Sequence, residues 1–544
     1  MRAALKATMG AATGDIPKRI DCDVLVVGGG INGTGIARDA SGRGLRVLLC
    51  EQDDLASHTS SASSKLIHGG LRYLEQYQFG LVRKALAERE ILLRGAPHIA
   101  RPLRFVMPYA PDARVRGQRP AWMLRAGLFL YDHLARRDFL PGSSALDLGI
   151  DPAGAALQPR FTRAFAYSDA WVDDARLVVL AALDARERGA TVLTRTRCTS
   201  ARREDGRWSA RLAGPDGERL VHARCLVNAA GPWAARFLGE SGALPPDGKR
   251  AALRLVKGSH IVLPRLFEHA QAYILQQPDG RIVFALPYEG EFTLVGTTDV
   301  EVGGEPGRER LDIDPAETAY LVDAVNRCFA RRAGLDDVVW SFAGVRPLIG
   351  DDGGAGDARA SSVSRDYRLV NDRAGAPLLS VFGGKVTTFR KLAEDAVDWI
   401  AAQLGRPVSG WTAQACLPGG DVYGKAPSAR AVLEFDAWLK TRQHQYAWLP
   451  ADLLARWAHA YGTRLGAMLA HCRAPADLGE EIVPGLFEVE ADYLVRQEWA
   501  LEAEDILWRR SKLGLHLAPG ASARVDAWLA ARRAGQRRGS VAAS

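Results

Sequence analysis

The chain has 544 residues, more than one hydrophobic core usually organises, so we expect two or three domains. Its 47% hydrophobic and 25% charged residues are typical of a globular protein and exclude a disordered chain or a membrane-embedded helical bundle. The net charge of +8 favours anionic partners such as phosphates, nucleic acid or acidic lipid, although a well-solvated basic surface explains it equally well.

The cysteines and the apolar runs narrow the setting of the protein. The seven cysteines are odd in number and form no CxxC pair, which predicts free thiols in a reducing compartment and no metal cluster. No apolar run approaches the roughly 20 residues of a membrane-spanning helix, so any membrane contact is expected to be peripheral. Residues 1–20 lack the apolar core of a secretory signal and are treated as an amino-terminal extension.

The first predicted unit is a strand, a helix and a second strand between residues 21 and 51. Gly28, Gly30 and Gly33 form a GxGxxG motif directly after the first strand. Such glycines allow a tight turn, close approach of a pyrophosphate and close helix packing, with the phosphate at the helix amino terminus. Glu51 ends the second strand, where a carboxylate can accept hydrogen bonds from ribose hydroxyls. These features predict a dinucleotide site, with NAD and FAD both open.

Two helices are predicted in the next part of the chain. Residues 80–95 form an amphipathic pattern that ends near Pro97. In 120–137 the apolar residues recur at spacings of three and four, while Arg125 and Arg136 lie on the other side. A helix packed against its own protein is the commoner explanation of this second pattern, and a membrane-surface helix is the more specific one.

The remaining sequence predicts a sheet region followed by helices. A helix is expected at 173–189, and strand-rich sequence up to about residue 300 predicts a mixed sheet. The turn-forming stretch 351–362 predicts a surface loop. Beyond about residue 405 we expect a separate helical domain that ends in a frayed tail after Ala530. Its helical patterns lie at 427–445, 450–473 and 488–513.

Seven further motifs follow Glu51 in a fixed order. They are SSASSKLIHGGLRYLE (60–75), WVDDARLV (171–178), NAAGPWA (228–234), KGSHIV (257–262), GTTD (296–299), GVRPL (344–348) and FGGKVTTFRKLAE (382–394). Together they resemble the flavin-dependent glycerol-3-phosphate dehydrogenases, from about Asp21 to at least Leu515. The carboxy-terminal YLVRQEWALEAEDILWRRSKLGL also resembles the helical domain of that family.

The resemblance implies a fold of the α/β plus α+β class, similar to that of the amino-acid oxidases. It comprises a discontinuous Rossmann-like FAD domain, an antiparallel-sheet substrate domain and an all-helical carboxy-terminal domain. The implied boundaries are 21–95, 166–245 and 340–405 for the FAD domain, 96–165 and 246–339 for the substrate-binding and membrane-facing domain, and 406–544 for the helical domain.

The resemblance also implies which residues hold FAD. The serine-rich segment is expected against the pyrophosphate and the flavin, and the glycines at 383–384 precede a helix whose free amides can stabilise negative charge on the flavin. The predicted cofactor-binding residues are Gly28, Gly30, Ile31, Asn32, Gly33, Glu51, Gln52, Ser61, Ser63, Ser64, Lys65, His68, Gly69, Gly70, Ala229, Gly231, Gly383, Gly384, Lys385, Thr387 and Thr388.

A dianionic phosphate needs cations on a rigid scaffold, and Arg346 and Arg72 are the best candidates because guanidinium forks match phosphate oxygens. Tyr73 and Lys385 are expected beside them in the substrate pocket. His260 is the first candidate for a general base, ahead of Lys385, although a lone histidine beside an apolar strand often has a structural role. The predicted catalytic residues are therefore His260, Lys385 and Arg346, with no metal.

The implied reaction is FAD-dependent oxidation of sn-glycerol 3-phosphate to dihydroxyacetone phosphate, by hydride transfer to flavin N5. Electrons are expected to pass to a membrane quinone, with the protein held peripherally on an anionic lipid surface at the cytoplasmic face of the inner membrane. The alternatives are an oxidase that uses oxygen and a non-catalytic flavin-binding interaction protein. The cationic motifs beside the predicted flavin argue against the latter. No nucleic-acid partner is expected, and a homodimer is compatible with the sequence.

Overall fold

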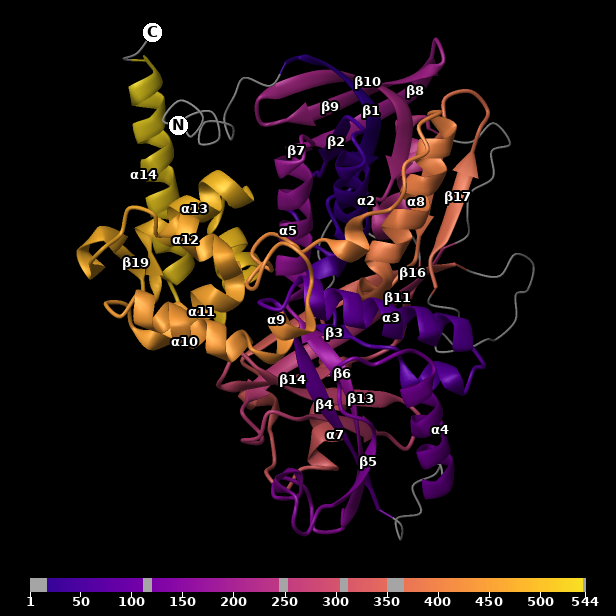
Figure 1. The fold of residues 1–544 in the computed structure, drawn as a ribbon, viewed down its shortest axis with the longest axis vertical. Helices are drawn as coiled ribbons and strands as arrows, with labels where there is room; N and C mark the ends of the chain where they lie inside the picture. The colour runs from indigo at the N-terminus through magenta and orange to yellow at the C-terminus, as the bar shows by residue number, and fades with distance from the viewer. Residues whose placement is uncertain (1–16, 111–119, 244–252, 304–311, 350–365, 542–544) are drawn as a thin grey trace.

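The computed structural model of the chain describes residues 17–110, 120–243, 253–303, 312–349 and 366–541. These residues form two large β-sheets, one above the other in Figure 1, with a helical carboxy-terminal domain at their side. The arrangement confirms the predicted fold class. The predicted loop 351–362 and residues 1–16 of the predicted extension lie outside the described residues.

The first sheet has eight strands and is parallel at its centre, in the order β17-β18-β10-β1-β2-β7. Val27 at the end of β1 pairs with both Cys50 and Asn228, so the carboxyl ends of β1, β2 and β10 lie side by side. Ligands bind at this edge in open parallel sheets. The strands are β1 (Arg19–Val27), β2 (Val47–Cys50), β7 (Thr191–Leu193), β8 (Arg197–Glu204), β9 (Arg207–Gly214), β10 (Gly217–Asn228), β17 (Arg368–Asp372) and β18 (Leu378–Phe382).

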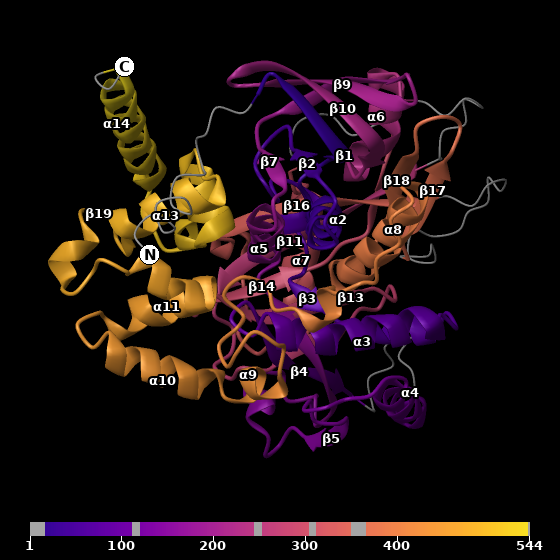
Figure 2. The ribbon, with the colours of Figure 1, turned by 45° about the horizontal axis from the view of Figure 1, so that its top comes forward.

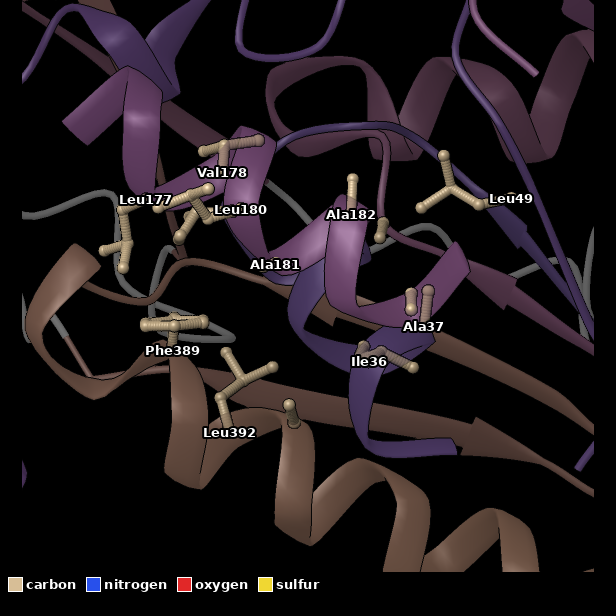
Figure 3. Packing of buried hydrophobic residues seen from close by; sticks show 14 of the residues in the cluster. Ile36, Ala37, Leu49, Leu177, Val178, Leu180, Ala181, Ala182, Phe389 and Leu392 are labelled. Atoms are coloured by element: carbon tan, nitrogen blue, oxygen red, sulfur yellow. The ribbon is translucent and has the colours of Figure 1, made fainter. Parts of the chain in front are cut away.

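Three helices pack around this sheet, and Figure 3 shows side chains of all three, together with Leu49 of β2, in one buried cluster. One of them is buried along almost its whole length, which explains its apolar run LVVLAAL. Gly35 lets two of the helices approach closely, because a Cβ there would lie 2.9 Å from the Phe389 ring. The helices are α2 (Ile31–Gly42), α5 (Asp174–Glu187) and α8 (Phe389–Gln403).

The second sheet has ten strands and is antiparallel except where β4 pairs with β12. The sheet is therefore largely antiparallel, as the resemblance implied, with one parallel pair that makes it mixed, as the strand-rich sequence predicted. The strands are β3 (Leu66–Ile67), β4 (Ala100–Tyr109), β5 (Ser144–Asp147), β6 (Arg163–Val172), β11 (Leu253–Pro264), β12 (Ala272–Gln276), β13 (Ile282–Tyr288), β14 (Phe292–Gly296), β15 (Val300–Val302) and β16 (Trp340–Ile349). Helix α7 (Pro315–Asn326) packs on β11, β13 and β14.

Two strands belong to a different sheet from the one that the predicted boundaries gave them. β6 and β16 were expected in the FAD domain, but β6 pairs along its length with β4, and β16 pairs along its length with β11. An alternating or apolar run predicts a strand without showing its partner, because the partner depends on the path of the whole chain. Through β16, the second sheet therefore contacts the turns Thr59–Ser61 and Gly231–Trp233, which lie beside the first sheet.

The carboxy-terminal domain is helical, as predicted, with a small hairpin of β19 (Glu481–Val483) and β20 (Leu486–Phe487). The long predicted helices are broken: Gly462 and Trp499 adopt positive φ and end their helices. The tail expected to fray after Ala530 is part of a helix that continues to Val541. The helices are α9 (Ala429–Leu433), α10 (Phe435–Gln445), α11 (Ala451–Tyr461), α12 (Leu465–Met468), α13 (Glu488–Glu498) and α14 (Ala521–Val541), with a π-helical turn at Asp505–Arg510.

Helices α3 (Phe79–Gly95) and α4 (Ala121–His133) confirm the two predicted amphipathic helices, and Figure 1 shows α4 at the edge of the molecule, far from α14. Leu128 and Tyr131 of α4 are buried against the second sheet. Large apolar side chains also face outward from α4: Trp122 is 70% exposed and Phe129 is 64% exposed. No helix in the described ranges is long and apolar enough to cross a membrane.

Candidate flavin and substrate site

The turn after β1 is built by glycines that leave no room for side chains. Gly28 has a φ of +113°, and a Cβ there would lie 2.4 Å from the carbonyl oxygen of Ala229. A Cβ at Gly33 would lie 1.9 Å from the Gly28 carbonyl. At Gly30, the N-cap of α2, a Cβ would meet only Ser60 Oγ, at 3.0 Å. Gly28 and Gly33 therefore serve packing, whereas Gly30 lines the pocket described below, where a pyrophosphate could approach.

Glu51 closes this turn from the end of β2. Its carboxylate accepts hydrogen bonds from the backbone N–H of Gly29 at 2.6 Å and of Asp53 at 2.9 Å. Burial raises the pKa of Glu51, and these two hydrogen bonds oppose the rise. The predicted ribose contact would use the remaining lone pairs of the carboxylate, which borders the pocket described next.

One elongated, mostly apolar pocket runs along the carboxyl edge of the first sheet. Ten predicted cofactor residues line it: Gly28, Gly30, Ile31, Asn32, Glu51, Gln52, Ala229, Gly231, Gly383 and Gly384. Residues that the sequence reasoning missed also line it, among them His58, Thr59, Ser60, Thr196, Cys198 and Trp233. Trp233 belongs to the NAAGPWA motif and could have been found there. Thr196 and Cys198 carried no signal, because only the pairing of β8 and β7 with the sheet brings them to the pocket.

The serine-rich loop is arranged differently from the prediction. Ser63 Oγ donates to Asp174 at 2.7 Å, and Ser61 Oγ donates to the carbonyl of His58 at 3.2 Å. Lys65 is 1% exposed, and its ammonium contacts Asp174 at 2.6 Å. Ser63 and Lys65, expected against the cofactor, instead hold the loop on the first turn of α5, because the buried Asp174 carboxylate needs a cation and donors. Ser61, also expected against the cofactor, closes a turn within the loop.

His260 lies in a buried contact between the serine loop and the second sheet. Its Nε2 is 2.8 Å from Ser64 Oγ, and its ring stacks on Phe342 at 4.8 Å between centroids. Burial, with the nearby Arg346 and Lys65 charges, lowers the pKa of His260 well below its ordinary value. His260 is therefore neutral at physiological pH, as a proton acceptor must be.

Arg346 projects from β16 over the neighbouring strand. Its guanidinium pairs with Asp299 at 2.5 Å and donates to Thr297 Oγ1 at 3.1 Å. A Cβ at Gly258 would lie 2.3 Å from Arg346 Nη2, so the glycine makes room for the guanidinium. Gly258 and His260 are two residues apart on β11 and share one face of the sheet. Arg346 and His260 are thus brought to the same side.

The loop at residues 68–73 and the loop at residues 383–388 contact each other beside this face of the second sheet. The Lys385 ammonium lies 3.7 Å from the centroid of the Tyr73 ring. The His68 N–H donates to Thr387 Oγ1 at 3.2 Å, and Asn32 donates to the carbonyl of Gly383 at 3.2 Å. Arg72 makes no ion pair with the part of the chain that the structure describes.

The remaining predicted loop residues support the backbone. The Gly69 N–H donates to the Tyr131 hydroxyl at 2.9 Å, and Gly70 has a φ of +81°. Thr388 is buried at the start of α8. A Cβ at Gly383 would lie 3.6 Å from the carbonyl of Pro347, so the loop that carries Lys385 packs on the strand that carries Arg346. Within the described ranges no cluster of His, Cys, Asp and Glu is arranged to hold a metal ion.

Comparison with known proteins assigns this site to a family. Residues 23–390 match the family model described as FAD dependent oxidoreductase, and residues 410–531 match the C-terminal domain of alpha-glycerophosphate oxidase. A glycerol-3-phosphate dehydrogenase of Pseudomonas aeruginosa is 52% identical over 513 residues, which cover 93% of this chain and 94% of the relative. The chain belongs to the FAD-dependent glycerol-3-phosphate dehydrogenase family.

A further relative and a solved structure are also similar to this chain. A D-erythritol 1-phosphate dehydrogenase of Brucella abortus is 47% identical over 93% of this chain and 97% of the relative. A solved structure of a glycerol-3-phosphate dehydrogenase from Bacillus halodurans, complexed with FAD, has a TM-score of 0.68 and 26% identity, over 97% of this chain and 93% of that one. The resemblance drawn from the sequence motifs is therefore confirmed, and FAD is the cofactor of the family.

The residues present fit FAD in this member of the family. Gly30 lines the pocket at the amino terminus of α2, and a Cβ at Gly231, where φ is +55°, would meet nothing within 4 Å. The pocket continues from this turn to Gly383 and Gly384, which precede α8. The turn after β1 and Glu51 would hold the adenosine half of FAD and its pyrophosphate, and the loop at 383–388 would hold the flavin end.

Proposed function

We propose that the chain oxidises sn-glycerol 3-phosphate to dihydroxyacetone phosphate. The observation that carries this proposal is the placement of Arg346 of β16 and His260 of β11 on one face of the second sheet, beside the loop that carries Lys385 and next to the predicted flavin end of the pocket. Bound FAD supplies a hydride acceptor for the carbon that is oxidised. The protein must supply an anion site and a proton acceptor.

Arg346 is proposed to bind the substrate phosphate. Asp299 and Thr297 fix the orientation of its guanidinium, and 23% of its side chain is exposed, so a ligand can reach it. Arg72 and Lys385 supply further positive charge. This arrangement favours a phosphorylated polyol over the polyol itself, because a dianion gains far more from guanidinium donors than a hydroxyl does.

The proton of the substrate C2 hydroxyl is proposed to reach His260 through Ser64. His260 is 1% exposed, whereas Ser64 is only partly buried, so the serine hydroxyl is the part of this pair that a substrate meets first. Ser64 Oγ would accept the proton and donate its own to Nε2 of the neutral imidazole, 2.8 Å away.

The electron acceptor is proposed to be a membrane quinone, with the protein peripherally attached to an anionic lipid surface at the cytoplasmic face. The support is the outward apolar face of α4, formed by Trp122, Met123, Phe129 and Leu130 and accompanied by Arg125. Such a face is typical of a helix that lies in a membrane interface. The alternative is an oxidase that reduces oxygen.

The purified protein separates these two functions when glycerol 3-phosphate oxidation is followed with a soluble quinone and with oxygen as the acceptor. The proposal predicts quinone reduction matched to product formed and little hydrogen peroxide. Peroxide formed in proportion to product, without quinone reduction, would favour the oxidase. A second substrate, D-erythritol 1-phosphate, belongs in the same assay because of the relative that is 47% identical.

A further inference from the structure

Asp54 is a buried carboxylate that the flavin and substrate chemistry does not use. It is 2% exposed and lies in the loop three residues after Glu51. Arg509 Nε donates to it at 2.7 Å, and Arg510 donates to it through both Nη1 and Nη2. Both arginines come from the π-helical turn of the carboxy-terminal domain, which Figure 2 shows beside the first sheet.

The loop that contains Asp54 forms one wall of the FAD pocket. Glu51, Gln52, Ala56, Ser57 and His58 all line the pocket, on both sides of Asp54 in the sequence. The Asp54 side chain therefore leaves this wall in the opposite direction and enters the carboxy-terminal domain. A movement of Asp54 would displace Glu51 and with it the turn that Glu51 closes through Gly29.

A second segment of the pocket wall adjoins Glu51 and is held by the same π-helical turn. The Arg195 N–H donates to the carbonyl of Asp53 at 2.7 Å, and the Thr196 N–H donates to the carbonyl of Glu51 at 2.6 Å. The Arg195 side chain reaches Asp505 of the π-helical turn at 2.7 Å. Thr196 lines the pocket. The loop after Glu51 and the segment 195–196 are therefore both linked to residues 505–510.

The contact between the Asp54 loop and the π-helical turn is made of buried, oppositely charged side chains. Arg509 is 4% exposed and Arg510 is 1% exposed. Burial alone would raise the pKa of Asp505, but the charges of Arg510, Arg195 and Arg509 lower it below its ordinary value. Removing one partner of such a buried network leaves an uncompensated charge, which is strongly unfavourable. The Asp54 carboxylate is thus held by buried cations of the carboxy-terminal domain.

We propose that Arg509 and Arg510 are positioning residues for FAD, which hold the Glu51 wall of the pocket through Asp54. The carboxy-terminal domain is then part of the cofactor site, although among the residues that the structure describes none that lines the pocket belongs to it. Loss of the contact should loosen the wall and speed the release of FAD, while Arg346 stays in place on the second sheet.

The test measures the rate of FAD release from the full-length holoenzyme, followed by the rise in flavin fluorescence after dilution. Asp54→Asn, Arg510→Met and the double variant are compared with Arg456→Met. Arg456 pairs with the buried Glu490 inside the same domain and touches no pocket residue, so it controls for general destabilisation. The thermal midpoint of each apoprotein is recorded as well.

We expect release to be roughly tenfold faster in both single variants, with the double variant little worse than either, because contacting residues are coupled. Excess FAD should restore the turnover of these variants. Arg456→Met should release FAD at the wild-type rate even where its thermal midpoint falls. Wild-type release in folded Asp54→Asn, or equally fast release in Arg456→Met, overturns the proposal. If Asp54→Asn does not fold, Arg510→Lys, which keeps the charge but loses the fork, is judged by the same two outcomes.

Discussion

The ammonium of Lys385 lies over the face of the Tyr73 ring, 3.7 Å from its centroid. Lys385 comes from the loop before α8 and Tyr73 from the loop after β3, so this contact joins two loops that are over 300 residues apart in the sequence. A cation over an aromatic face is stabilised by about 0.5 to 2 kcal/mol, most when the pair is shielded from water.

Tyr73→Leu should therefore weaken substrate binding, because Lys385 loses the surface that orients it. We expect the dissociation constant of glycerol 3-phosphate to rise by roughly 2- to 30-fold, which corresponds to that energy range. Tyr73→Phe is the matched control, since it keeps the ring and removes only the hydroxyl. Equal weakening in the two variants would assign the effect to the hydroxyl instead.

Arg346→Lys should weaken glycerol 3-phosphate binding by about 1 to 3 kcal/mol while FAD stays bound. The lysine keeps the charge but cannot pair with Asp299 and present a fork to the phosphate at once. Titration of the oxidised flavin spectrum with substrate measures the change. Unaltered binding in a fully flavinated Arg346→Lys protein would move the phosphate site, with Arg72 next in order.

The rate of flavin reduction should not fall through protonation of His260 between pH 8 and the ordinary histidine pKa of 6.5, because burial and the neighbouring cations lower its pKa well below that value. His260→Asn and Ser64→Ala should both slow reduction by a similar factor, about 10²- to 10⁴-fold, if the proton passes from one to the other. Stopped-flow reduction over the pH range checks this. A clear loss of rate centred near pH 6.5 that disappears in His260→Asn would contradict the lowered pKa.

The same histidine has a predicted effect on stability. The folded chain keeps His260 neutral, so the unfolded chain binds more protons once the pH falls below about 6.5. The contribution of His260 to the free energy of unfolding is fully present above that pH and decreases as the pH falls.

Replacing Trp122 and Phe129 by serine should weaken attachment to anionic lipid vesicles without changing flavin content, because both side chains point outward from α4. Co-sedimentation with vesicles measures this. Leu433→Ser is the control, since Leu433 is 67% exposed but lies in the carboxy-terminal domain. If the protein with serine at Trp122 and Phe129 still sediments with the vesicles as the wild type does, α4 is not the attachment surface.

The cofactor turn could be predicted from the sequence because its requirements are local. The strand, the GxGxxG spacing and the helix all lie within residues 19–42, although the carbonyl that excludes a side chain at Gly28 belongs to the distant Ala229. The ordered motifs then identified the family. Local chemistry was enough for both.

The serine loop could not be predicted in the same way. Lys65 and Ser63 were expected to face the cofactor. Both instead donate to the carboxylate of Asp174, which lies more than 100 residues further along the chain. The sheet that contains β16 was also missed, since its partner β11 lies about 80 residues away in the sequence. In both cases a distant partner decided the role, and the local pattern contained no trace of it.

Anaerobic titration of the purified holoenzyme tests the central claim most directly. Substrate is added without any acceptor, and the absorbance of the oxidised flavin is followed. Our account predicts that stoichiometric sn-glycerol 3-phosphate reduces the bound FAD and yields dihydroxyacetone phosphate, whereas glycerol at the same concentration does not. FAD that stays oxidised with sn-glycerol 3-phosphate, but is reduced by D-erythritol 1-phosphate or by neither, would contradict it.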